Sequence, residues 1–325
     1  MYLSNKFFLS AENTNELLFA ARYTARLLAL FFGLSLNVAL SETAAAVNWP
    51  DGYVVYENTA SPDGRYGVLV PTMEAWEQDE SLSEANYLAD IKNHRVLGKI
   101  DKVDYFEHQN HRGLEVFWAP QSSVCVVEND GRYGADSISV LEINDSSFAQ
   151  KEIGDRIQKS LDGAMKKQAH APEMAGDVSP YFRFGTDRKV RVRALSQNNP
   201  KQFEDVKTYY ALFQGTFDVA AKKWTVTDAR SISAEQDDAL ETAYSDLERD
   251  LEHTTFQNEE DKAESLDKKM NKVYSAAQFI LPPARFTAVK KEQIEWLKKR
   301  NAAPSTEEKC KLMEARIKAL QELVW

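Results

Sequence analysis

Hydrophobic and polar residues follow a period of two along the first part of the chain beyond residue 50. Between Tyr53 and about Ser231, short runs rich in Val, Tyr, Phe and Leu alternate with Gly, Asp, Asn and Pro. This pattern is typical of antiparallel strands joined by tight turns. Among the later strands we expect Tyr181–Phe184, Lys189–Leu195, and Tyr209–Thr216 paired with Lys223–Ala229.

Two segments interrupt the strand pattern. Ile153, Ile157, Leu161 and Met165 are spaced four residues apart, which predicts one amphipathic helix inserted in the strand region. The next segment, His170–Pro180, contains two prolines and a glycine, so we expect a loop there.

After Ser233 the apolar positions change to the 3.6-residue period of helices. Ser233 suits a helix start, and Pro282-Pro283 and Pro304 interrupt the later pattern. The apolar positions expected to face a core form four groups: Leu240, Tyr244, Leu247 and Leu251; Leu266, Met270, Val273, Tyr274 and Ala277; Val289, Ile294, Trp296 and Leu297; Leu312, Met313, Ile317, Leu320 and Leu323. We therefore predict an α+β protein: an antiparallel β-rich domain at 47–232, propeller-blade-like or a sandwich, then an all-α helical domain at 233–325.

A five-residue motif occurs twice in the β-rich region. The sequence DGRYG occupies Asp63–Gly67 and returns at Asp130–Gly134, and the turn Ser61–Gly64 (SPDG) has a weaker echo in Ala119–Ser122 (APQS). Asp-Gly pairs supply turn positions with positive φ, so the repeat predicts hairpins. The SPDG turn also resembles the turn found in blades of TolB-type β-propellers. Two or three blades are too few for a closed propeller, which uses about 4–8, so we expect an open, blade-like sheet or sandwich.

The N-terminal region carries a pattern typical of export. Leu27–Leu40 is fourteen residues long without a charge, with arginines before it and small residues after it. This combination predicts a secretory signal peptide over residues 1–46, because a membrane-spanning helix needs about 20 apolar residues. Small residues permit cleavage after Ala39–Ser41 or after Ala44–Ala46. We expect a periplasmic or secreted protein with no stable membrane span; the alternative is an uncleaved anchor or a buried core helix.

The charge balance narrows the choice of partners. The 325 residues include 40 Lys and Arg against 50 Asp and Glu, a formal net charge of -10. This acidity disfavours nucleic-acid binding, because neutralising phosphates requires a clustered basic surface. In the helical region, 231–267 holds thirteen acids and two bases, whereas 268–325 holds six acids and thirteen bases. Two explanations stay open: the two halves pair within the molecule, or an acidic face at Asp237–Glu264 is presented to a basic protein.

No catalytic motif stands out in the sequence. It contains no nucleophile elbow, P-loop, Rossmann fingerprint or His-Glu-x-x-His pattern. His94, His108 and His111 form the grouping that most suggests a metal, but no further ligand is marked. We therefore expect no enzyme activity, no cofactor and no metal site, and we keep a His-based metal enzyme as an alternative.

Three motifs follow one another in the helical region. They are Met270–Tyr274 (MNKVY), Lys291–Arg300 (KEQIEWLKKR) and Cys310 followed by an Arg-x-x-x-Leu pair. In this order they resemble the LprI-type lysozyme-inhibitor domain, over roughly Leu266–Leu323. The resemblance implies a small helical module of the bacterial envelope, some of whose relatives inhibit lysozyme.

Four residues match the family-type positions of that domain: Asn271, Tyr274, Trp296 and Arg300. We expect the two aromatic residues in the core, and the other two in a structural polar contact rather than against a partner. The chain departs from the family at Asn301, where the family has Asp.

The sequence contains two cysteines, Cys125 and Cys310. The second cysteine that the resemblance implies for the helical module is missing, so the family's disulfide cannot form within it. An exported chain meets an oxidising compartment, where Cys125 and Cys310 are candidates for a bridge between the two predicted domains. Two separately buried thiols are the alternative.

These observations lead to one expected function and one alternative. We expect an exported protein-binding protein whose partner is basic, with inhibition of a cationic lysozyme through the helical domain as its specific form. The alternative is a structural or sensory envelope protein in which the β-rich domain binds a ligand or a protein partner.

Overall fold

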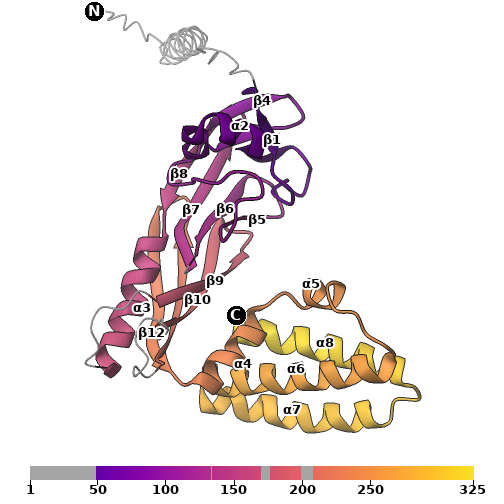
Figure 1. Cartoon of the computed structure of the whole chain (residues 1–325). Helices are drawn as coiled ribbons and strands as arrows, with labels where there is room; N and C mark the ends of the chain where they lie inside the picture. Colours follow the sequence, from indigo (N-terminus) through magenta and orange to yellow (C-terminus); the bar gives the residue numbers. More distant parts are fainter. Residues whose placement is uncertain (1–48, 133, 170–175, 199–207) are drawn as a thin grey trace, which may run out of the picture. The chain divides into compact units, whose positions relative to one another are not determined.

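The computed structural model of the protein describes residues 49–132, 134–169, 176–198 and 208–325 (Figure 1). Residues 47–325 form one compact unit. Within the described residues, no helix is both long and apolar enough to cross a membrane. The signal peptide expected over residues 1–46 lies outside the described residues and stays a prediction.

The strands form three four-stranded antiparallel sheets. Sheet A contains β1 (Tyr53–Val55), β2 (Tyr66–Pro71), β3 (Tyr87–Asp90) and β4 (Arg95–Lys99). Sheet B contains β5 (Gly113–Trp118), β6 (Val124–Gly131), β7 (Gly134–Asn144) and β8 (Ser147–Glu152). Sheet C contains β9 (Gly176–Phe184), β10 (Lys189–Asn198), β11 (Tyr210–Asp218) and β12 (Lys223–Ile232). In each sheet the strands neighbour one another in chain order, so the expected antiparallel, blade-like architecture is confirmed.

Helical segments interrupt the strands at two places. The helix α3 (Gly154–Ala169) lies where the four-residue spacing predicted it. Sheet A also carries α2 (Met73–Gln78) and the short 3-10 helix η1 (Glu80–Glu84), which we did not predict. Six residues are too few to show a helical period, and α2 depends on its cap, where Thr72 Oγ1 accepts the Ala75 N–H at 3.2 Å.

Sheet B packs on both of its faces. Cys125 and Val127 of β6 belong to one hydrophobic cluster with residues of sheet A. Val124 and Val126 belong to another cluster with residues of sheet C and of α3. Because successive side chains of a strand point to opposite faces, β6 supplies both cores and reads as a continuous apolar run.

The strand β9 corrects one expectation from the sequence. The loop expected at His170–Pro180 is wrong at its end, because β9 begins at Gly176 and contains Pro180. Pro180 lies opposite Ala194 of β10, and β9 is the edge strand of sheet C. An edge strand accommodates proline, since the missing N–H faces away from the sheet.

The two DGRYG copies occupy turns that are not equivalent. The first copy lies between β1 and β2, where Gly64 has a φ of 67°. The second joins β6 to β7, and there the described glycine with positive φ is Gly134, at 107°, not Gly131 as the Asp-Gly pairing predicted. Both copies form turns as expected, but at different places in their sheets.

The weaker echo APQS is the structural counterpart of SPDG. Each joins the first and second strands of its sheet. The Gly64 N–H donates to the main-chain oxygen of Ser61 at 2.7 Å, and the Ser122 N–H donates to the main-chain oxygen of Ala119 at 2.9 Å. Ser122 Oγ also accepts the Asp63 N–H at 3.4 Å, so these two turns lie side by side.

Helices make up most of the chain after Ser233 (Figure 1). They are α4 (Ala234–Tyr244), α5 (Leu247–Glu252), α6 (Glu259–Ile280), α7 (Pro283–Asn301) and α8 (Thr306–Val324). Figure 1 shows α6, α7 and α8 side by side, in orange and yellow. The chain changes from strand to helix at Ser233, where the side chains of Ser233 and Gln236 form a capping box.

The first helical stripe of the sequence is divided between two helices. We expected one stripe from Leu240 to Leu251, but α4 ends at Tyr244. Asp246 then caps α5, its Oδ1 accepting the Glu248 N–H at 2.8 Å. A capping aspartate favours a new helix start over continuation of the old one.

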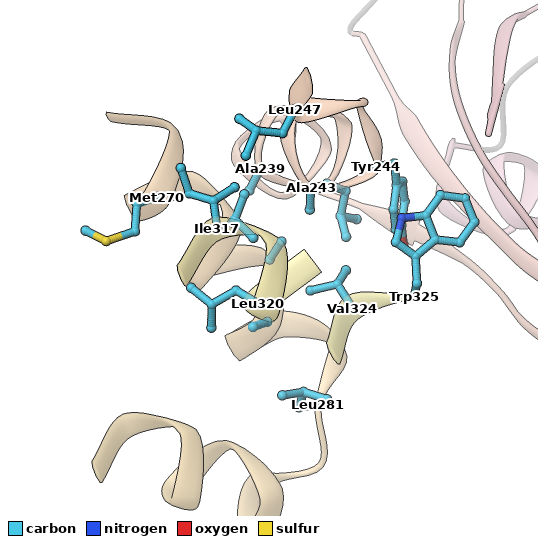
Figure 2. Packing of buried hydrophobic residues seen from close by; sticks show 14 of the residues in the cluster. Ala239, Ala243, Tyr244, Leu247, Met270, Leu281, Ile317, Leu320, Val324 and Trp325 are labelled. Atoms are coloured by element: carbon cyan, nitrogen blue, oxygen red, sulfur yellow. The ribbon is translucent and has the colours of Figure 1, made fainter. Parts of the chain in front are cut away.

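The helices share a core with sheet C. Figure 2 shows Ala243, Tyr244, Leu320 and Val324 gathered where α4 meets α8. Leu195, Leu212 and Ile232 of sheet C belong to the same hydrophobic cluster. The helical region is therefore anchored on a sheet by apolar burial, the main favourable term in folding.

The residues that α7 buries against its neighbours differ at one place from the apolar positions expected from the sequence. Ile294, expected in the core, is 49% exposed, whereas Gln293 is buried. The Gln293 amide is satisfied there: Nε2 donates to Met270 Sδ at 3.6 Å, and Oε1 accepts from Arg316 Nε at 2.8 Å. A hydrogen-bonded glutamine can take a core position, which a purely hydrophobic pattern misses.

Candidate binding cleft

A cavity of about 950 Å³ lies between sheet B, the edge of sheet C and the helices. Its lining comes from β5, β6, the first residue of β7, β9, α4, α5 and α8, from the residues between α4 and α5, and from Trp325 after α8. Glu115 and Trp325 both line it, so segments far apart in the sequence meet there. A cavity of this size suits a ligand or a segment of another protein.

Three carboxyl groups line the side of the cleft formed by sheet B. Glu115 and Glu128 are directly opposite on β5 and β6, and Asp130 follows two residues later on β6. Cross-strand partners share one face of a sheet, which brings the first two side chains together. The side chain of Glu128 is hydrogen-bonded to that of Asp130.

The environment of Glu128 favours the protonated form of its carboxyl group. Only 5% of Glu128 is exposed, and burial together with the negative charge of Asp130 raises its pKa well above the usual range. Two neighbouring carboxyl groups in a buried site disfavour each other's ionisation. Burial also raises the pKa of Glu115, while Arg249 opposes that shift.

Aromatic rings line the opposite side of the cleft. The ring centroids of Tyr181 and Tyr244 are 5.5 Å apart, and those of Tyr244 and Trp325 are 5.3 Å apart. Figure 2 shows Tyr244 and Trp325 beside each other at the end of the helical cluster. The Tyr244 hydroxyl accepts from Gln214 Nε2 of β11 at 3.1 Å, which ties this wall to sheet C.

Two arginines of sheet C hold Trp325. The Arg183 guanidinium lies 4.6 Å from the centroid of the indole ring, and its Nη1 is 2.5 Å from Glu322 Oε1. The buried Arg193 donates to the main-chain oxygen of Trp325, with its guanidinium 5.5 Å from the ring. Arginine over indole is a favourable cation–π arrangement that grows stronger as it is desolvated.

The lining of the cleft is acidic overall. Seven carboxylic side chains line it: Glu115, Glu128, Asp130, Glu241, Asp246, Glu248 and Glu322. Three basic side chains line it: Arg183, Arg249 and Lys318. Arg183 and Lys318 are already paired, with Glu322 and Glu248 respectively. The cleft therefore keeps a net negative charge even with Glu128 protonated.

Ion pairs within the helical region account for much of its charge segregation. Five of the thirteen acids in 231–267 pair with bases in 268–325. The pairs are Asp238–Lys272, Glu248–Lys318, Asp250–Lys269, Glu264–Lys268 and Asp267–Arg300. Of the two explanations left open by the sequence, pairing within the molecule therefore applies to these five acids. The acidic surface at Asp237–Glu264 is correspondingly smaller than its composition suggests.

The four family-type positions lie away from the cleft, on α6 and α7. Asn271 Nδ2 is 3.5 Å from Asp267 Oδ2, and Arg300 also pairs with Asp267, so both polar residues meet at one carboxylate. Tyr274 and Trp296 are half-buried against the helical cluster. A smaller cavity of about 310 Å³ between α6 and α7 has Asn271, Tyr274 and Arg300 in its lining.

The structure contains Cys125 and Cys310 as free, buried thiols. Cys125 lies in the core between sheets A and B, and Cys310 lies in the helical core. The bridge considered from the sequence is absent because the two thiols belong to different hydrophobic clusters. Burial raises the pKa of both thiols, which lowers their reactivity.

The three histidines considered as metal ligands occupy turn positions. His94, His108 and His111 have φ values of 49°, 62° and 60°. The His94 ring stacks on Trp49, with centroids 4.3 Å apart. Within the described residues, no group of three or more His, Cys, Asp or Glu side chains is arranged to hold a metal ion.

Asp237, in the first turn of α4, makes stability depend on pH. Burial, Glu241 and Asp238 raise its pKa from 3.8 to about 7. Between these two values the folded state keeps a proton that the unfolded state loses, so stability falls as pH rises from about 4 to about 7.

Asp237→Asn is expected to stabilise the protein at pH 8 by about 1–2 kcal/mol, after discounting for solvent screening of a partly exposed group. The same substitution should have little effect at pH 3.5, where both forms of the side chain are neutral. Urea unfolding at the two pH values measures the difference, with the exposed Glu235→Gln in the same turn as a control. An equal effect at both pH values contradicts this assignment.

The sequence did not point to the carboxyl groups of the cleft. With fifty acids in the chain, closeness in sequence says little about which of them meet. One signal was present: Glu128 directly follows the apolar run Val124–Val127, and a charged residue in a buried strand needs a partner. Nothing in the local sequence links Glu128 to Tyr244 or Trp325.

No family model, no curated protein and no solved structure matches the chain.

Proposed function

We propose that this protein is an exported, non-enzymatic binding protein that takes a cationic protein partner in the acidic cleft. The observation that carries the proposal is the lining of the cavity, in which seven carboxylic side chains face three basic ones. Two of those bases are already paired with lining acids. A positively charged partner gains both steering and contact energy from such a surface.

The aromatic wall supports the same choice of partner. Tyr181 is half-buried in the cavity lining next to the carboxyl groups, and the buried rings of Tyr244 and Trp325 extend the same wall. Lys and Arg side chains bind well where ring faces and carboxylates lie together, because the ring attracts the cation and the carboxylate pairs with it. Lysozyme is the specific basic partner that we propose, on the basis of the LprI resemblance of the helical region.

A second candidate function places the binding site in the β-rich region alone. The observation in its favour is that Glu115, Glu128 and Asp130 all come from β5 and β6 of sheet B. In this version the helices only support the β-rich region, and the protein has a structural or sensory role in the envelope.

The test is a titration of residues 47–325 against c-type and g-type lysozymes and a basic protein of another class, at low and high salt. Screening shortens the reach of charges from about 10 Å at 0.1 M to about 3 Å at 1 M salt. We expect micromolar or tighter binding that high salt weakens at least tenfold, and slower lysozyme turnover. Absence of salt-sensitive binding to every cationic protein contradicts the proposal.

Variants locate the site on the molecule. Glu115→Gln with Asp130→Asn should weaken binding at least fivefold, whereas Glu57→Gln with Glu77→Gln, two exposed acids in the turn after β1 and in α2, should not. Glu241→Gln on α4 separates the two candidate functions. A loss in this variant favours a site shared with the helices, and an unchanged affinity favours the site on the β-rich region alone.

A further inference from the structure

Among the described residues no strand pairs with the outer edge of β9, and the cleft runs along this edge. Six consecutive residues of this strand, 178–183, line the cavity. Successive side chains of a strand point to opposite faces, so a single face would supply only every second residue. A continuous run of lining residues means that the cavity borders the edge of the strand, where main-chain groups are presented.

The register of β9 shows which main-chain groups face the cavity. The Gly185 N–H donates to the Lys189 oxygen at 2.8 Å, which fixes the hydrogen-bonded pairs with β10. In an antiparallel ladder these pairs alternate with pairs that point outward. Counting back along the register with β10 places Val178, Pro180 and Phe182 in the outward positions. Gly134 of β7 lies against the main chain of Val178, where an added Cβ on the glycine would be 2.8 Å from the Val178 nitrogen, so an added strand would pair at Pro180 and Phe182. Pro180 has no N–H to present, which agrees with a position on the edge.

The carboxyl groups of sheet B face this edge across the cavity. Glu128 and Asp130 are two residues apart on β6, and Glu115 is paired with Glu128. Residues two apart on a strand repeat at about 6.6–6.8 Å, the same spacing as alternate side chains of an extended peptide. An extended segment lying along β9 would therefore present every second side chain to these carboxyl groups.

We infer that the cleft takes an extended segment of the partner, which adds to sheet C as a fifth strand at β9 and carries basic side chains at alternate positions. This inference rests on the proposed function and names the form of the ligand. Main-chain hydrogen bonds to the edge would supply affinity that is independent of sequence, and the carboxyl groups would select Lys or Arg at every second residue.

Pro180 and Phe182 set how the added strand lies. The Phe182 N–H and carbonyl both point outward, whereas Pro180 offers only its carbonyl, so the ladder lacks one bond at that position. The side chains of Tyr181 and Arg183, which also line the cavity, pack against Tyr244 of α4 and Glu322 of α8 and keep the edge in place.

The test uses alternating Thr-Lys octapeptides with fluorescence anisotropy on residues 47–325. The comparison peptides are an alternating Thr-Glu octapeptide and a Thr-Lys octapeptide of the same composition in which the lysines are grouped at one end. We expect the alternating Thr-Lys peptide to bind at least tenfold more tightly than either, and Glu115→Gln with Asp130→Asn to remove this preference. The exposed pair Glu57→Gln with Glu77→Gln should keep it.

Backbone methylation separates strand pairing from simple charge attraction. Methylating the main-chain nitrogens of alternate residues removes the N–H donors of one edge of the peptide only. We expect methylation of one alternate set of residues to weaken binding more than tenfold and methylation of the other set to weaken it less than twofold. The reason is that only one edge of the peptide meets β9. Equal effects of the two alternations, or no effect of either, overturn the inference.

The outcomes separate this inference from the proposed function. If whole cationic proteins bind with the salt dependence described above but none of the octapeptides binds, strand addition is overturned and the proposed function stands. If neither whole proteins nor peptides bind, both fail. Binding of the grouped and alternating peptides with equal affinity also overturns strand addition, because charge alone then accounts for recognition.

Discussion

Trp325→Ala is expected to lower the free energy of unfolding by about 3–5 kcal/mol, the usual cost of removing a large buried aromatic side chain. Trp325 is 9% exposed and packs on Tyr244, with ring centroids 5.3 Å apart. Its ring also lies against the guanidinium groups of Arg183 and Arg193. Alanine would remove the ring contacts and leave both cations of sheet C without the ring face that stabilises them.

Chemical denaturation of residues 47–325 measures this effect, and Trp325→Phe is the matched control. The indole Nε1 has no hydrogen-bond partner within the described residues, so phenylalanine loses no hydrogen bond and keeps a ring face. We expect Trp325→Phe to cost less than half as much as Trp325→Ala. A loss below 1 kcal/mol for Trp325→Ala would show that helices and sheet C do not depend on this contact for stability.

Phe213→Ala in β11 is expected to cost about 3–5 kcal/mol for a different reason. Phe213 is completely buried in the core between sheets B and C and α3. Its ring packs edge-on against Trp224 of β12, with centroids 5.5 Å apart. The ring also covers Gly215, where an added Cβ would lie 2.8 Å from it, beside the irregularity in the β11–β12 ladder. Alanine would leave a cavity that a sheet with this irregularity cannot readily close.

The midpoint of urea unfolding reports the loss, and Ile294→Ala on α7 is the control. Ile294 is 49% exposed, so its truncation should cost less than about 1 kcal/mol. If Phe213→Ala cost no more than this surface substitution, the assignment of the core between sheets B and C would be wrong.

The architecture was largely predictable from the sequence because its elements follow local rules. Strict alternation in Lys189–Leu195 lies inside β10, and the four-residue spacing from Ile153 to Met165 falls on α3. Ser233 caps the first helix after the strands, as its position suggested. Each of these signals is local, because hydrophobic periodicity and helix caps depend on residues that lie within a few positions of one another.

Local rules failed where a neighbour distant in sequence decided the outcome. Pro180 suggests a loop by composition, yet an edge position lets it stay in a strand. Gln293 is polar, yet Met270 and Arg316 satisfy it in the core, while the apolar Ile294 is left exposed. The periodic pattern identifies the helix correctly but cannot say which polar groups find partners.

The cleft could not be predicted for the same reason. Three of its carboxyl groups come from β5 and β6 and four from the helical region, whereas the rings of its aromatic wall come from β9, α4 and the residue after α8. The composition showed the negative charge, and the acids of the helical region were the candidates for an acidic binding surface. Folding pairs several of these acids with lysines and arginines and leaves the lining of the cleft with an excess of acids.

The sequence by itself determined the strand and helix periods, the change between them at Ser233 and the acidic balance, because these depend on neighbouring residues or on simple sums. Tertiary structure alone decided which edge of sheet C stays free, which acids are paired, and that Glu128 is buried beside Asp130. Shifted pKa values and edge exposure depend on distance and on the exclusion of water, and both arise only when remote segments pack together.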